Sequence, residues 1–110
     1  TSNNIINYNA ENRRRLDLAF SISYDADISK AKAVIMDVIE ENSLIFTEPA
    51  PIIAVKEHAA SSINLACLIW CSGDDYWDIF YYMQEAVKLS FDKNGISIPY
   101  GQIDVHIVKE

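Results

Sequence analysis

Apolar and polar residues alternate along the chain in stretches that predict β-strands. In "RRRLDLAFSISY", Leu16, Leu18, Phe20 and Ile22 point one way and the residues between them point the other. In "SINLACLIWC" nearly every position is apolar, which is typical of a central strand covered on both faces or lying at an interface. The shorter "IIAVKEH" lies between these two stretches, and we expect it to form another strand.

Two further stretches carry apolar residues at three- and four-residue spacing, and each predicts an amphipathic helix. The first begins after Asp27, whose carboxylate is a good N-cap, and extends to about Asn42. The second opens at Ser72-Gly73-Asp74 and closes at Gly95, which we expect to adopt a left-handed conformation. The inner stripe of this second helix is predicted to comprise Tyr76, Ile79, Phe80, Met83, Val87 and Phe91.

A short apolar segment, "ISIP", follows the second helix and predicts a fourth strand. The element order is then β-α-β-β-α-β, so the fold class is α+β and the architecture a ferredoxin-like plait over residues 13–99. Both helices and two of the strands should contribute to its core, which we expect to contain Phe20, Ile35, Leu65, Ile69, Phe80 and Met83.

Residues at both ends fall outside this plait. A short strand-like remnant, Ile5 to Tyr8, lies within residues 1–12, and the absence of an initiator Met at Thr1 leads us to expect an excised fragment. Residues 100–110 predict an extra C-terminal strand with Ile103, Val105 and Ile107 on one apolar side. Such a strand can pair with its own sheet or with other copies of the chain.

Composition and charge narrow the possible partners. The 110 residues are enough for one domain, and the net charge is −7. A negative surface argues against nucleic acid or an anionic membrane as a partner. The one basic cluster, Arg13-Arg14-Arg15, better fits local ion pairing or an interface than phosphate binding. The chain as given contains neither a membrane span nor a signal peptide, so we expect the fragment itself to be soluble.

The titratable residues do not indicate an enzyme, a metal site or a cofactor. Several aspartates could suggest a metal or acid–base site, but most lie at helix starts, where carboxylates are stabilised regardless of function: Asp25, Asp27, Asp74, Asp75 and Asp78. His58 is expected in a turn, and His106 shares a strand face with Asp104. Cys67 and Cys71 lie roughly 13 Å apart along one strand, too far for a disulfide. Free thiols fit a reducing compartment.

Aromatic residues of the second helix extend beyond its core stripe. Trp77, Tyr81 and Tyr82 lie on its flanking faces. Amphipathic aromatics in such positions are enriched at interfaces, although large aromatics also cover sheet edges. We take Trp77 and Tyr81 as interface candidates, together with Ile103, Val105 and Ile107 of the last strand.

Five short motifs, in this order and spacing, connect the chain to a known family. They are the Arg-Arg before the first strand, the Tyr-Asp-x-Asp-Ile helix start, the strand Ser-Ser-Ile-Asn, the exit Gly-Ile-x-Ile-Pro and the late Gln-x-Asp-Val. Over nearly its whole length the chain resembles the cytoplasmic C-terminal domain of small-conductance mechanosensitive ion channels, the MscS family. Gly101 departs from the proline usual in the family, and leaves the direction of the last strand less constrained.

The resemblance implies a function that spacing alone does not show. Such channels are homo-heptamers of the inner membrane that open under tension and release ions and small solutes. Residues 1–12 would be the tail of a preceding β-domain with its linker, and residues 13–99 the wall of a vestibule on the cytoplasmic face. Residues 100–110 would join six other copies in a parallel barrel. We expect the isolated fragment to be a monomer or a low oligomer.

A second class of function is a free-standing ferredoxin-like regulatory domain that binds a small ligand at a subunit interface. Such sensors place glycine-rich ligand loops after the first strand, and this chain has "SYDADI" there. Three apolar spans encoded before Thr1 would decide for the channel.

Overall fold

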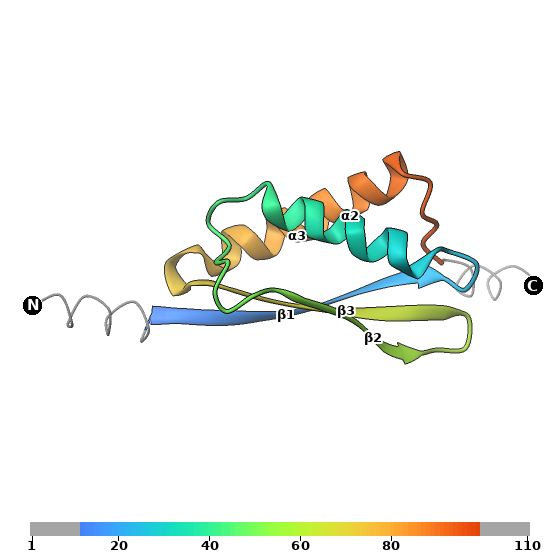
Figure 1. Ribbon diagram of the computed structural model, residues 1–110, viewed down its shortest axis with the longest axis horizontal. Coiled ribbons are helices and arrows are strands. Elements are labelled where there is room, and N and C mark those ends of the chain that lie inside the picture. Colours follow the sequence, from blue (N-terminus) through green and yellow to red (C-terminus); the bar gives the residue numbers. More distant parts are fainter. Residues whose placement is uncertain (1–11, 100–110) are drawn as a thin grey trace, which may run out of the picture.

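The computed structural model describes residues 12–99, which form a mixed α+β fold (Figure 1). Its three strands are β1 (Arg13–Ser23), β2 (Ile52–His58) and β3 (Ser62–Ser72). Helix α2 (Ile28–Glu40) connects β1 to β2, and the short 3₁₀ helix η1 (Gly73–Asp75) leads from β3 into helix α3 (Tyr76–Lys93). The three strands and two helices expected from the patterns before residue 94 are therefore all present.

The three strands form one antiparallel sheet in the order β1-β3-β2. Leu16 lies opposite Ile69 and Phe20 opposite Leu65, so the apolar rows of β1 and β3 share one face. The pairing of β2 with β3 is shifted between Val55 and Glu57 by a bulge. β3 is thus the central strand, because its two neighbours satisfy its backbone groups on both edges.

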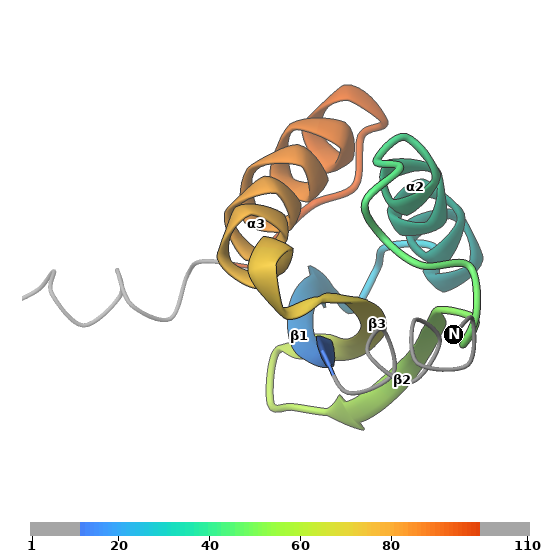
Figure 2. The ribbon, with the colours of Figure 1, turned by 90° about the vertical axis from the view of Figure 1, so that its left-hand side faces the viewer.

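Both helices lie on the same face of the sheet, side by side (Figure 2). The carboxylate of Asp27 accepts a hydrogen bond from the Lys30 amide at 3.1 Å, which confirms it as the N-cap of α2. After α3, Gly95 has φ +71, and Ile96 donates its amide to the Phe91 carbonyl at 2.9 Å. Gly95 therefore closes the helix in the left-handed conformation that the sequence predicts.

The core fills the space between the sheet and the two helices. Five of the six expected core residues are buried there: Phe20, Ile35, Leu65, Ile69 and Met83. The sixth, Phe80, is only partly buried, and that prediction is wrong. The buried stripe of α3 is centred on Ile79, Met83, Val87 and Phe91, and Phe80 lies at its margin.

The prediction of a fourth strand at residues 96–99 is also wrong. These residues are not in a strand, although they pass the outer edge of β1, where the Ser23 amide donates to the Ser97 carbonyl at 3.0 Å. The helix-closing turn holds Ile96 in the core, and Pro99 has no amide to donate, so too few groups remain for a ladder. The described residues therefore give a three-stranded sheet and two helices, without the last strand of the plait.

Two alternatives were open for β3, cover on both faces or a place at an interface, and within this domain the helices cover one face only. Its side chains alternate between a buried row under the helices and a partly exposed row on the opposite side. The apolar character of the second row therefore needs an explanation other than the core of this domain.

Candidate assembly interface

Three aromatic side chains gather on the outer side of α3 near its start. The ring centroids of Trp77 and Phe80 are 5.4 Å apart, those of Phe80 and Tyr81 5.5 Å, and those of Trp77 and Tyr81 6.0 Å. Trp77 is 58% exposed and Tyr81 62% exposed. We call these three residues the aromatic cluster. Such amphipathic rings at the surface are the residue types enriched at interfaces.

The neighbouring aromatics of α3 have partners within the domain. Tyr82 donates its hydroxyl to the Val38 carbonyl at 2.7 Å, which ties α3 to α2. Burial raises the pKa of this phenol, and the nearby Glu41 carboxylate adds to the effect. Tyr76 lies under the guanidinium of Arg14, whose central carbon is 4.3 Å from the ring centroid. Tyr82 and Tyr76 are therefore accounted for by the fold, whereas Trp77 and Tyr81 are not.

Carboxylates lie beside the aromatic cluster, and the Arg14 guanidinium lies on the adjoining Tyr76 ring. Asp74 and Asp78 flank Trp77 along the chain and are exposed. Within residues 12–99 neither carboxylate forms an ion pair, since the two pairs found there join Arg15 to Asp17 and Lys88 to Asp92. The Arg15–Asp17 pair agrees with the local ion pairing expected for the basic cluster.

The face of the sheet away from the helices is a second exposed surface, and we call it the open face. At its centre Ala19, Ala66 and Ala54 lie in one row across the three strands. Beside this row lie Leu68 and Ile52, which are register partners, and Ile52 is 54% exposed. The strand patterns alone did not identify this surface, because the register decides which residues of different strands become neighbours.

Each end of the open face has a polar border. At one end the Ser21 hydroxyl donates to the Asn64 side-chain carbonyl at 2.6 Å, and the Asn64 amide donates to Glu57 at 2.8 Å. At the other end the Arg13 guanidinium lies 5.2 Å from the centre of the Trp70 ring, and Arg13 makes no ion pair within residues 12–99. The apolar centre is therefore bordered at one end by a hydrogen-bonded network that includes the Glu57 carboxylate, and at the other end by a cation with no ion pair among the described residues.

The remaining candidates from the sequence do not converge on a chemical site. The ring of His58 lies edge-on to Tyr24. Within residues 12–99 no three His, Cys, Asp or Glu side chains lie close enough to hold a metal ion. His106, Asp104 and the interface candidates Ile103, Val105 and Ile107 lie outside the described residues.

Both cysteines are buried as free thiols in the row of β3 that faces the helices. Burial raises the pKa of Cys67 to about 12. Burial also raises the pKa of Cys71. The Asp75 carboxylate raises this pKa further, whereas the Arg14 guanidinium lowers it. Thiols with raised pKa values are poor nucleophiles at neutral pH, so both act as small apolar core residues.

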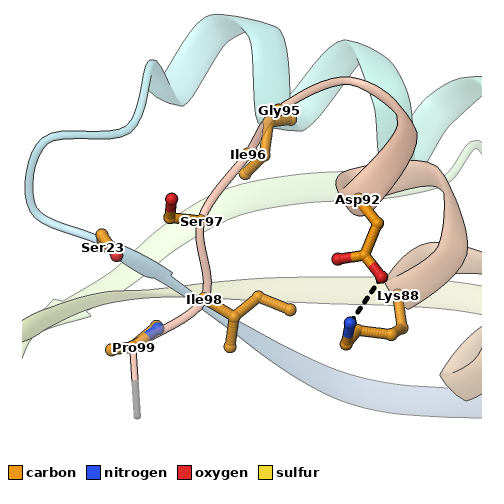
Figure 3. A pocket seen from close by; sticks show the side chains of 8 residues that line it. All are labelled: Ser23, Lys88, Asp92, Gly95, Ile96, Ser97, Ile98 and Pro99. Carbon is orange, nitrogen blue, oxygen red and sulfur yellow. Dashed lines mark hydrogen bonds and ion pairs between the residues drawn. The ribbon is translucent and has the colours of Figure 1, made fainter. Parts of the chain in front are cut away.

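A hollow of about 650 Å³ lies where α3 ends beside the outer edge of β1 (Figure 3). Its walls include Ser23, Ser97 and the ion pair of Lys88 with Asp92. The two charges compensate each other, and neither serine has a histidine among the lining residues. Among the described residues, the hollow therefore has no histidine that would act as the base for a serine nucleophile.

Known proteins resemble this chain over nearly its whole length. The family model described as "Mechanosensitive ion channel MscS, C-terminal" matches residues 16–98. A small-conductance mechanosensitive channel of Edwardsiella ictaluri is 39% identical over 104 residues, covering 94% of this chain and 36% of the relative. An uncharacterized MscS family protein of Synechocystis sp. is 39% identical over 107 residues, covering 97% of this chain and 36% of the relative.

Among solved structures, the chain matches the crystal structure of Helicobacter pylori MscS in its closed state. The TM-score is 0.77 at 25% sequence identity, and the match covers 89% of this chain and 39% of that one. The chain thus spans little more than a third of the length of the relatives it matches. No helix among residues 12–99 is long and apolar enough to cross a membrane.

Proposed function

The chain belongs to the MscS family of mechanosensitive ion channels, and from this premise we propose that it is the non-catalytic cytoplasmic domain of such a channel. In this role it forms part of the wall of a vestibule, helps to hold the subunits together and filters solutes on their way to the pore. The observation that carries the proposal is the family match over residues 16–98. The matched family and relative are described as mechanosensitive channels, which supports a non-catalytic role.

We further propose that the channel is a homo-heptamer and that this domain lies at the cytoplasmic face of the inner membrane. Trp77 and Tyr81 would then be covered by a neighbouring subunit. Their exposure in the single chain, together with a core stripe that is filled without them, supports this assignment. The roles of Ile103, Val105 and Ile107 in a parallel barrel, and the division into residues 1–12, 13–99 and 100–110, stay predictions.

The proposal is tested with the complete coding sequence to which the chain belongs. Three apolar spans encoded before Thr1, and a tension-activated conductance in patches from cells that express the product, are the expected results. Cells that lack their own channels should survive osmotic downshock when they carry this gene. A product without tension-activated conductance, despite correct insertion in the membrane, would contradict the proposal.

The regulatory-domain alternative receives no specific support from the described residues. The loop between β1 and α2 contains no glycine, so it lacks the ligand loop of that class. If the coding sequence has no apolar span before Thr1, this alternative replaces the channel.

The isolated chain offers a separate test of the last strand. Seven chains would have to associate against a large loss of translational freedom, and each carries a charge of −7. We expect sedimentation at micromolar concentration to show a monomer or a low oligomer. A heptamer that collapses when residues 102–110 are removed would overturn that expectation and establish the barrel.

A further inference from the structure

The chain carries two exposed apolar surfaces of different shape. The aromatic cluster projects from α3, with Tyr81 62% exposed and Trp77 58% exposed. The centre of the open face is lined by three alanines in one row, flanked by Ile52 and Leu68. Alanine side chains are short, so large rings from another molecule can approach the sheet closely there. We therefore expect the projecting rings to fit against the alanine row.

Two carboxylates lie beside the aromatic cluster, and a cation lies at the end of the open face away from Glu57. The exposed carboxylates of Asp74 and Asp78 lie beside Trp77. The open face is bordered by Arg13, which lies over Trp70. Arg15, on the same face, is already paired with Asp17 at 2.7 Å. Contact between an aromatic cluster and that end of an open face would bring Arg13 close to Asp74 and Asp78, none of which has an ion pair within residues 12–99.

The carboxylates oppose symmetric pairing of two aromatic clusters. Such a contact would bring Asp74 and Asp78 of both chains together. Like charges placed together at an interface are destabilising and select against the wrong partner. In a ring of more than two subunits, as in the proposed function, neighbours meet through a heterologous contact, with a different surface used on each chain. Repeated heterologous contacts generate a ring when the rotation between neighbours closes.

We propose that the aromatic cluster of one copy docks on the open face of the next copy, head to tail around the assembled channel. The inference rests on the proposed function, because a second copy is the occupant. The inference goes beyond the proposed function by assigning the surface of the neighbouring copy that Trp77 and Tyr81 contact. Within it, Arg13 of one subunit faces Asp74 and Asp78 of its neighbour, and the rings of Trp77 and Tyr81 cover the alanine row, Ile52 and Leu68.

Disulfide cross-linking of the full gene product in membranes tests this arrangement. Tyr81→Cys and Ile52→Cys place one exposed thiol on each surface, while Cys67 and Cys71 stay buried. The chain with both substitutions should give a ladder of covalent multimers under mild oxidation, because every contact joins residue 81 of one copy to residue 52 of the next. Each single variant should stay monomeric on denaturing gels.

A matched control uses the same helix. Leu89 is 57% exposed on α3 but lies outside the aromatic cluster. Leu89→Cys combined with Ile52→Cys should therefore give no ladder. Dimers from the Tyr81→Cys single variant would show a symmetric contact and overturn the inference.

A charge exchange provides a second measurement. In the cross-linking variant, Arg13→Glu should slow ladder formation about fivefold, the effect of one lost charge pair at an interface rim. Adding Asp78→Arg to the same chain should restore the rate. Lys56→Glu, the same charge change at another exposed site of the sheet, should leave the rate unchanged. Equal slowing by Lys56→Glu would reduce the effect to net charge and overturn the proposed pairing.

The mass of the detergent-solubilised protein and its conductance separate the two proposals. If the protein assembles and conducts under tension but gives no ladder, the head-to-tail contact is wrong and the proposed function stands. If the protein neither assembles nor conducts, both fail.

Discussion

The two faces of β3 are built from similar residues but have different surroundings. On one face the helices bury Leu65, Ile69 and both cysteines completely. On the other face Ala66, Leu68 and Trp70 remain partly exposed. Apolar composition alone therefore does not define the core of this domain. The buried row stabilises the single chain, whereas we assign the second row to contact with another chain.

Two phenylalanines on α3 should show the largest difference in stability between a buried and a partly exposed position. Phe91 is 1% exposed, whereas Phe80 lies at the edge of the core. We expect Phe91→Ala to lower the free energy of unfolding by about 3–5 kcal/mol, and Phe80→Ala by about 1–2 kcal/mol. Urea denaturation of the isolated chain measures both. Equal losses would place Phe80 in the core after all.

Leu65 and Leu68 make the same comparison within β3. Leu65→Ala should cost about 2–5 kcal/mol through lost transfer energy and a cavity. Leu68→Ala removes the same atoms from the open face and should cost about 1 kcal/mol or less. Denaturant midpoints of the two variants provide the measurement. A Leu68→Ala variant as unstable as Leu65→Ala would show that the open face is covered even in the isolated chain.

The polar border of the open face should contribute less. Asn64→Ala removes the hydrogen bonds to Ser21 and Glu57 while leaving the buried row intact. A loss of about 0.5–1.5 kcal/mol is expected from the same urea experiment. Ser97→Ala, an exposed change outside the sheet, is the control and should be close to neutral. If the two variants unfold at the same urea concentration, the network does not stabilise the chain.

The smallest effect on stability at neutral pH should come from the ionisation of Cys67 on the buried face. Its pKa is raised to about 12 by burial, so below the ordinary pKa of a thiol it is protonated both folded and unfolded. Above that value the unfolded chain releases the proton while the folded chain keeps it. Stability should therefore fall as the pH rises from about 9 towards 12. Cys67→Ala should make this decline shallower, and an identical decline would mean that Cys67 ionises readily in the folded chain.

The local elements were determined by the sequence. Alternating residues predicted β1 and β3, three- and four-residue spacing predicted α2 and α3, and the helix ends at Asp27 and Gly95 were correctly identified. These features depend on neighbours within a few positions, which is why they can be read without a structure. The short motifs likewise indicated the family, which the comparisons with known proteins then established.

Two outcomes depended on tertiary structure. The predicted strand at residues 96–99 requires a partner edge and free amides. Pro99 has no amide, and the turn at Gly95 holds Ile96 in the core, so a single hydrogen bond joins these residues to β1. Phe80 has the spacing of a core residue, but the stripe of α3 that packs against the sheet runs through Ile79, Met83, Val87 and Phe91 and leaves Phe80 at its margin. Neither property is encoded in a local pattern.

The open face depends most strongly on the fold. Residues 19, 54 and 66 are far apart in the sequence, and only the pairing of three strands brings them into one row. The placement of both helices on the opposite face then leaves that row uncovered (Figure 2). The sequence determined which residues are apolar, whereas the register and the side chosen by the helices decided which of them a second chain can contact.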